Sequence, residues 1–237
     1  MVSRWKLDEG TGVTANDIWG LNNGSIIGST WKNDTHCVSG KCLSFNGTIS
    51  DYIDCGSDDS LNIRDKITVS MWVNPRTLPT LDSNQQTLYT RGNVYSFLIL
   101  NYVNGKIYVL QSSGSGWINL AITSSQFLYI NKWTHIAASY DSGSGEIKIF
   151  ANGLNVKTSG NTPSQITSSI PTVIGARNGG SYSFDGLIDD VRIYNEALSS
   201  VQIKQNYIAG LNSMLVNGNM SKEEYNQKIE TLSFSIK

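Results

Sequence analysis

Hydrophobic and polar residues alternate with a period of two through most of the first 195 residues. Short apolar alternations follow one another along the chain, and Gly, Asn and Ser residues typical of turns separate them. The segments of this kind are 41–47, 51–56, 67–75, 87–92, 95–105, 106–113, 118–125, 132–142, 145–153, 154–160, 172–179 and 187–195. Roughly a dozen strands at this spacing predict an all-β fold, a sandwich of two antiparallel sheets.

Two Asn-Gly pairs lie between such alternations, at Asn104-Gly105 and Asn152-Gly153. The two-residue turns that suit a twisted hairpin need positive φ angles, which Asn and Gly adopt at low cost. Each pair therefore predicts a hairpin.

After Asn195 the hydrophobic period lengthens to about four, as in a helix. Ser199 is suited to cap a helix that carries Val201, Ile203, Tyr207 and Leu211.

A second helix is expected after Gly218. Ser221 and Glu224 have the spacing of a capping box, and Met220 and Tyr225 that of a hydrophobic staple. The apolar stripe continues through Ile229 and Leu232 and needs a surface to cover. It either packs back on the domain, pairs with the first helix or contacts another molecule, so self-association through the C-terminal helices stays open.

Composition and charge narrow the class of protein. The chain has 237 residues, 22 Gly, 4 Pro and a net charge of −1. No cluster of Lys and Arg offers a surface for nucleic acid, and no apolar run approaches the ~20 residues of a membrane span. The N-terminus enters strand-like sequence at once, so we expect that a secretion signal or an upstream segment has been removed.

The three cysteines bear on whether the chain is in an oxidising or a reducing compartment. If Ser39-Gly40 forms a two-residue turn, Cys37 and Cys42 face each other across a hairpin within disulfide range. A disulfide fits an extracellular or cell-surface location, and the alternative is two reduced thiols in an intracellular protein. Cys55 has no local partner and reads as a buried small hydrophobic residue.

Several segments together resemble the laminin-G-like, concanavalin-A-like domains of bacterial and archaeal surface and secreted proteins. They are "WKLDEGTGVTANDIWGLNNGSIIG", "KCLSFNGTISDYIDCG", "ITVSMWVNP", "KWTHIAASYDSGSGEIKIFANG", "TVIGARNG" and "FDGLIDDVRIYNEALSSVQI". The resemblance implies a jelly-roll β-sandwich over residues 1–197, followed by a short helical hairpin over residues 198–237. It implies no single function, because the fold hosts lectins, adhesion modules and glycosidases. In some relatives such a domain follows a pilin-like N-terminal helix.

The adjacent acids Asp189 and Asp190 interrupt the alternation of the last strand. Strict alternation cannot direct both Ile188 and Val191 to the core, although both are apolar. A β-bulge at the acid pair would allow both to be buried. An acid near the core must be paired, hydrogen-bonded or bound to a metal, and Arg192 is the simplest partner.

The resemblance also implies one structural calcium between the first loop and the closing strand. The matching positions are Asp17 and Asp189, with Asn22, Asn23 and Gly24 as further oxygen donors. Relatives more often have a Ser-Ser-Gly turn where this chain has "DIWGLNNG". Calcium and hydrogen-bonded strand closure without metal both remain open at this point.

No catalytic set stands out in the sequence. Retaining glucanases of this fold carry closely spaced glutamates along one strand, and the chain has no Glu-x-Asp-x-Glu segment. The histidines are His36 and His135, and neither has the spacing of a zinc site. The chain is therefore expected not to be an enzyme.

Two functions remain. The first is a carbohydrate-binding or adhesive module that recognises a glycan or cell-surface protein through its rim loops, with Trp117, Arg177, Asn178 and Tyr182 as candidate contacts. The second is a structural or assembly domain of a pilin-like surface appendage. Trp5, Trp72 and Trp133 belong to strand motifs and are expected in the core.

Overall fold

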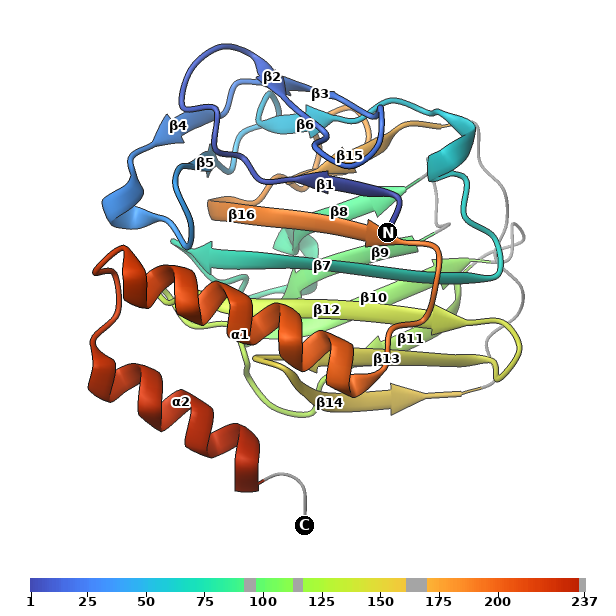
Figure 1. The fold of residues 1–237 in the computed structure, drawn as a ribbon. Helices are drawn as coiled ribbons and strands as arrows, with labels where there is room; N and C mark the ends of the chain where they lie inside the picture. Colours follow the sequence, from blue (N-terminus) through green and yellow to red (C-terminus); the bar gives the residue numbers. More distant parts are fainter. Residues whose placement is uncertain (92–96, 113–116, 161–169, 235–237) are drawn as a thin grey trace.

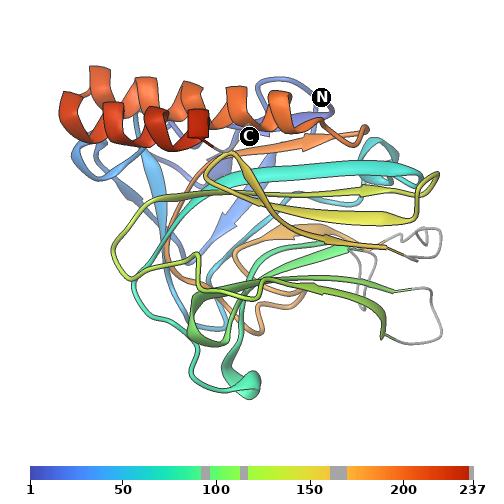
Figure 2. The ribbon, with the colours of Figure 1, turned by 90° about the horizontal axis from the view of Figure 1, so that it is seen from below.

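The computed structural model describes residues 1–91, 97–112, 117–160 and 170–234. In this part of the chain two antiparallel sheets lie face to face, and a helical hairpin covers one of them from outside (Figures 1 and 2). The all-β sandwich predicted from the alternating pattern is confirmed. None of the described helices is long and apolar enough to cross a bilayer.

Each sheet has eight strands. Sheet A runs in the order β14 (Leu154–Ser159), β13 (Glu146–Ala151), β12 (Thr134–Asp141), β7 (Lys66–Pro75), β16 (Asp185–Tyr194), β5 (Cys42–Asn46) and β4 (Thr30–Lys32), with β1 (Ser3–Trp5) also on β16. Sheet B runs in the order β11 (Trp117–Ile122), β10 (Lys106–Ser112), β9 (Phe97–Tyr102), β8 (Gln86–Arg91), β15 (Thr172–Ile174), β6 (Tyr52–Asp54), β3 (Gly24–Ile27) and β2 (Thr14–Ala15). Four 3₁₀ turns join them: η1 (Asp34–His36), η2 (Asp59–Leu61), η3 (Asp82–Asn84) and η4 (Val103–Gly105).

The main core lies between the sheets. Inward side chains such as Phe45 and Val69 of sheet A meet Ile53, Tyr89 and Ile99 of sheet B, all fully or almost fully buried. Burying one large apolar side chain contributes about 1.5–3 kcal/mol, so this layer supplies the main driving force for closing the sandwich.

Both Asn-Gly pairs form connections, as predicted. Asn152 and Gly153 have φ angles of 50° and 79° in the tight turn between β13 and β14. Asn104 and Gly105 lie in η4, which joins β9 to β10.

The predicted bulge lies where β16 changes neighbour. The first half of β16 pairs with β5, and its second half pairs with β1 along the same edge. On the other edge, the pairing with β7 shifts register between Asp189 and Arg192, and Asp190 has a φ of 47°. The two acids therefore occupy the junction between β5 and β1.

The predicted disulfide between Cys37 and Cys42 is present, with 5.5 Å between the Cα atoms. The predicted two-residue hairpin is wrong, because β4 ends at Lys32, which pairs with Cys42. Residues 33–41 form a longer loop that contains η1, and the disulfide closes this loop. Cys55 is buried, as expected.

The C-terminal hairpin consists of α1 (Ser200–Val216) and α2 (Lys222–Phe234). The Ser199 side chain caps α1, and the backbone N–H of Glu224 donates to the Ser221 hydroxyl at the start of α2. The apolar stripe lies against the outer face of sheet A, where Tyr207, Leu211, Met214, Met220 and Leu232 form one cluster with Trp72 of β7 and Val38. The stripe is thus packed on the sandwich and between the helices, and self-association stays untested.

Candidate functional site

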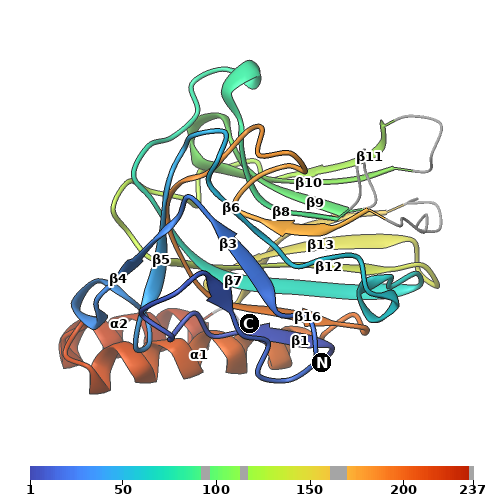
Figure 3. The same cartoon turned by 90° about the horizontal axis from the view of Figure 1, so that it is seen from above.

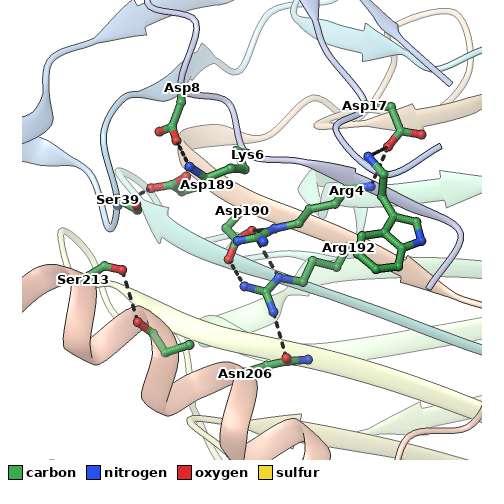
Figure 4. A network of polar contacts seen from close by, with 12 residues as sticks. Arg4, Lys6, Asp8, Asp17, Ser39, Asp189, Asp190, Arg192, Asn206 and Ser213 are labelled. Atoms are coloured by element: carbon green, nitrogen blue, oxygen red, sulfur yellow. Dashed lines mark hydrogen bonds and ion pairs between the residues drawn. The ribbon is translucent and has the colours of Figure 1, made fainter. Parts of the chain in front are cut away.

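The acid pair joins three elements through a chain of charged and polar groups (Figure 4). Asp190 accepts hydrogen bonds from Arg4 Nε of β1 at 2.8 Å and from Arg192 Nη2 at 2.5 Å. Arg192 Nη1 continues to Asn206 Oδ1 of α1 at 2.8 Å. Burial alone would raise the pKa of Asp190, but Arg192 and Arg4 outweigh it and hold that pKa below its usual range.

Asp189 performs a different task on the other side of β16. Its Oδ2 accepts the backbone N–H groups of Val38 at 2.8 Å and Ser39 at 3.1 Å, and this fixes the disulfide loop to the closing strand. Burial, reinforced by the charge of Asp190, raises the pKa of Asp189 well above its ordinary value. Each acid therefore ties β16 to a neighbouring element. Arg192, the partner expected from the sequence, pairs with Asp190.

A polar groove lies on the side of the sandwich away from the helical hairpin. We call it the η3 groove, and it has a volume of about 560 Å³. Residues of three segments line it: 46–49 after β5, 77–86 around η3, and 181–185 before and in β16. Figures 2 and 3 show η3 projecting on the face opposite α1 and α2.

Hydrogen bonds fix one wall of the η3 groove. Asp185 accepts from the Thr77 hydroxyl at 2.9 Å and is paired with Arg76. Gln86 Nε2 donates to Thr77 Oγ1 at 2.9 Å, and its Oε1 accepts from Asn101 at 2.9 Å. A wall of this kind presents carboxylate, hydroxyl and amide groups in set positions.

Tyr182 gives the groove an aromatic edge. It is 40% exposed, and the Arg177 guanidinium lies 4.1 Å from the centroid of its ring. Its carbonyl accepts the Thr87 N–H at 2.7 Å, which fixes the residue at a φ of 54°. The ring is therefore held at the surface beside the polar wall.

The matching family model agrees with this architecture. The model described as "Concanavalin A-like lectin/glucanases superfamily" (Laminin_G_3) matches residues 46–204. The chain belongs to this superfamily. No curated protein sequence matches the chain significantly.

Solved structures share the concanavalin A-like fold at low identity. The binding domain of Paraclostridial Mosquitocidal Protein 1 aligns with a TM-score of 0.72 and 16% identity over 89% of this chain and 52% of that one. Domain 4 of AbnA, an extracellular arabinanase of Geobacillus stearothermophilus in complex with arabinotriose, aligns with a TM-score of 0.66 and 23% identity over 86% and 96%. A Trypanosoma rangeli sialidase aligns with a TM-score of 0.65 and 16% identity over 87% and 32%. The chain therefore spans about half of the mosquitocidal binding domain.

The structure does not bring the five expected calcium ligands together. Asp17 Oδ1 accepts the backbone N–H groups of Arg4, Trp19 and Gly20, and its Oδ2 accepts that of Asn22. Burial would raise the pKa of Asp17, but these hydrogen bonds outweigh it and lower that pKa. The carboxylate is thus surrounded by N–H donors, which repel a cation.

The other expected ligands are also engaged elsewhere. Asn22 Nδ2 donates to Ser3 Oγ at 2.8 Å, Asn23 Oδ1 accepts the Asp17 N–H at 2.9 Å, and Gly24 begins β3. Asp17 and Asp189 share no partner and face different loops (Figure 4). No three His, Cys, Asp or Glu side chains of the described residues gather as a metal site. Hydrogen bonds of the first loop account for Asp17, whereas Asp189 is held through Oδ2 alone and its Oδ1 is buried without a hydrogen-bond partner among the described residues. Because Asp17 is saturated by N–H donors and faces a different loop from Asp189, the five residues do not fit one calcium ion.

We expect a calcium chelator to leave the melting temperature unchanged, because the carboxylates already have protein donors. A structural ion held at a hundredfold excess over its Kd would contribute about 2.7 kcal/mol, which chelation would remove. Differential scanning calorimetry in EDTA and in millimolar calcium measures this directly. A melting temperature that falls in EDTA would show that calcium binds, at these residues or at others.

The structure brings two of the four expected glycan contacts together. Tyr182 lines the η3 groove, and the Arg177 guanidinium lies over the Tyr182 ring. Asn178 follows Arg177 in the same turn and does not line the groove. Trp117 begins β11, and its side chain lies outside the described part of the structure.

Sequence reasoning missed most of the η3 groove and misplaced Trp133. Asp185, Thr77 and Gln86 come from distant segments, and none of them was among the predicted site residues. Trp5 and Trp72 are buried as expected. Trp133 is only half-buried and lies in the loop before β12, which begins at Thr134.

Proposed function

We propose that the chain is a non-catalytic carbohydrate-binding module of a secreted or cell-surface protein, and that it holds a neutral oligosaccharide in the η3 groove. The observation that carries this proposal is the juxtaposition of the Tyr182 ring with the Asp185–Thr77–Gln86 wall. Sugars have apolar ring faces and polar edges, and ligand sites generally combine apolar walls with a few convergent polar groups. The disulfide supports an extracellular location.

The family membership supports binding as the kind of activity. The similar solved structures include a toxin binding domain and an arabinanase domain in complex with arabinotriose. The sialidase among them means that absence of catalysis has to be measured as well. We propose arabinotriose as the first ligand to test, followed by an array of neutral glycans.

The test uses two aromatic variants. Tyr182→Asn removes the ring and keeps a residue that tolerates positive φ. The control Trp19→Asn removes an exposed ring that lines none of the three grooves of the described structure. Loss of one stacking surface is worth about 1–1.5 kcal/mol, so we expect roughly tenfold weaker binding for Tyr182→Asn and no change for Trp19→Asn by titration calorimetry.

Two results would overturn the proposal. One is the absence of binding by any neutral glycan, and the other is equal weakening by both variants. Chromatography after long incubation of the chain with each glycan tests for catalysis. Shortened saccharides in the product would contradict the non-catalytic assignment.

A second candidate function, assembly with other proteins, is favoured by one exposed loop. Ile18, Trp19 and Leu21 of the loop after β2 are 53%, 63% and 97% exposed, and Val13, just before β2, is 71% exposed. The Asp17 carboxylate fixes this loop through four backbone N–H groups, so its apolar side chains are displayed on a rigid support. Sedimentation velocity of the native chain and of Trp19→Ser measures self-association. Self-association of the native chain that Trp19→Ser removes, together with no binding of any glycan, would favour assembly.

A further inference from the structure

Two further grooves flank Trp133 at the edge of the helical hairpin. Their volumes are about 460 and 510 Å³, and both are lined by Asn131, Trp133 and Asn219. We call this continuous surface the Trp133 groove. It is distinct from the η3 groove, because the two share no lining residue.

Elements beyond the matched superfamily segment build one wall. Met214 and Met220 line the groove from the end of α1 and the turn after it, and Glu224 and Lys228 line it from α2. The superfamily match ends at residue 204. In Figure 1 the end of α1, η1 and the end of β7 lie at the same side of the molecule. Residues of these three elements line the two grooves.

The opposite wall is fixed by the disulfide loop. The Trp133 indole N–H donates to the His36 carbonyl at 2.9 Å, which sets the orientation of the ring. Asn219 Nδ2 donates to the carbonyls of Asp34 and Cys37, at 2.5 and 2.9 Å. The hairpin and the disulfide loop therefore hold each other, and the groove is built in advance of any ligand.

The lining combines aromatic faces with carboxamides. Phe127, Tyr129 and Trp133 supply rings, and Asn131, Asn152 and Asn219 supply amide groups. Rings pack against apolar faces of a ligand, and amides donate to and accept from hydroxyl groups. This is the chemistry of a saccharide site rather than of a purely apolar one.

Positive charge distinguishes this groove from the η3 groove. Among its lining residues, Lys228 is paired with Glu224 and Arg76 with Asp185. Lys32 and Lys132, one in each half, form no ion pair with a carboxylate of the described residues. The Lys132 ammonium lies 5.8 Å from the centroid of the Tyr129 ring, so its charge is placed beside an aromatic face. The whole chain carries a net charge of −1, so this local excess is not a general property of the surface.

We infer that the Trp133 groove is a second binding site, which takes an acidic saccharide. A uronic or sialic acid residue would lie against Trp133 and Tyr129, and its carboxylate would pair with Lys32 or Lys132. This site shares no lining residue with the η3 groove, so it can be tested independently of the proposed neutral-glycan site.

The test compares each acid with its uncharged methyl ester. Trigalacturonate and 3′-sialyllactose are titrated into the native chain by calorimetry at low salt, alongside their methyl esters. At least one acid is expected to bind up to about five times more tightly than its ester, because one surface ion pair with lysine contributes up to about 1 kcal/mol. Equal affinity of acid and ester for both saccharides, or binding of neither acid, would overturn the inference.

Lysine variants locate the site without disturbing the packing. The double variant Lys32→Gln with Lys132→Gln should lose the preference for the acid. The control Lys106→Gln with Lys157→Gln removes the same charge from lysines that line neither groove, and it should keep the preference. Tyr182→Asn should also keep it, which separates this site from the η3 groove. A preference that survives in the Lys32/Lys132 variant, or that falls equally in the control, would contradict the assignment.

Discussion

Replacement of Arg192 by Met is expected to lower the free energy of unfolding by about 3–5 kcal/mol. The substitution removes the main partner of Asp190, which is only 8% exposed, and leaves a buried carboxylate with Arg4 alone. Removing one member of a buried ion pair typically costs this much, because the remaining charge stays desolvated. Urea denaturation followed by tryptophan fluorescence measures the change.

A second variant separates the effect of the lost ion pair from the effect of lost packing. Asp190→Asn combined with Arg192→Met removes both charges, and Asn tolerates the φ of 47° at position 190. The double variant should be more stable than Arg192→Met alone. As a control, Lys66→Met breaks the exposed pair with Asp141 between β7 and β12, and it should cost less than about 1 kcal/mol. A double variant no more stable than the single one would show that packing, not charge, dominates at the bulge.

Replacement of Trp72 by Ala is expected to cost about 3–5 kcal/mol and to loosen the helical hairpin. Trp72 is 2% exposed, and its ring stacks on Tyr207 of α1 with 5.4 Å between centroids. A Cβ atom at Gly210 would lie 2.5 Å from the Trp72 ring, so α1 approaches this side chain as closely as a glycine permits. Loss of the Trp72 ring should therefore weaken the packing of both α1 and α2 on sheet A.

Hydrogen exchange identifies where the Trp72 variant opens. Amides of α1 and α2 should exchange faster, while those of β8, β9 and β15 in sheet B should change little. The control is Trp19→Ala, which removes the same side chain from a position that is 63% exposed and should change stability by less than about 0.5 kcal/mol. Unchanged exchange in the hairpin would contradict the packing described between Trp72 and α1.

Much of the fold could be predicted because its signals are local. Period-two alternation predicted the strands from β5 onward but not β2, β3 and β4, which are two to four residues long. The conflict between Ile188 and Val191 predicted the bulge. Ser199 and Ser221 gave the helix starts, since a cap depends only on residues within one turn. The disulfide was predicted for the right cysteines but on the wrong turn, because η1 lengthens the loop before Cys42.

The sites were less predictable because they depend on backbone groups and on distant segments. Asp17 and Asp189 were expected to share a cation, but both Asp17 oxygens and the Oδ2 of Asp189 accept peptide N–H groups, which leave no signature in the sequence. The wall of the η3 groove joins Thr77, Gln86 and Asp185, which only the closed sandwich brings together. Trp133 was placed in the core by its strand motif, although it precedes the strand by one residue.

The central claim is that the η3 groove binds an oligosaccharide, and nuclear magnetic resonance of the ¹⁵N-labelled chain tests it most directly. On titration with the tightest neutral glycan, beginning with arabinotriose, the amide signals of residues 46–49, 77–86 and 181–185 should shift. Those of residues 127–134 at the Trp133 groove should stay in place. Saturation with every neutral glycan of the array without a shift in the three η3-groove segments, or with shifts confined to another face, would contradict the account.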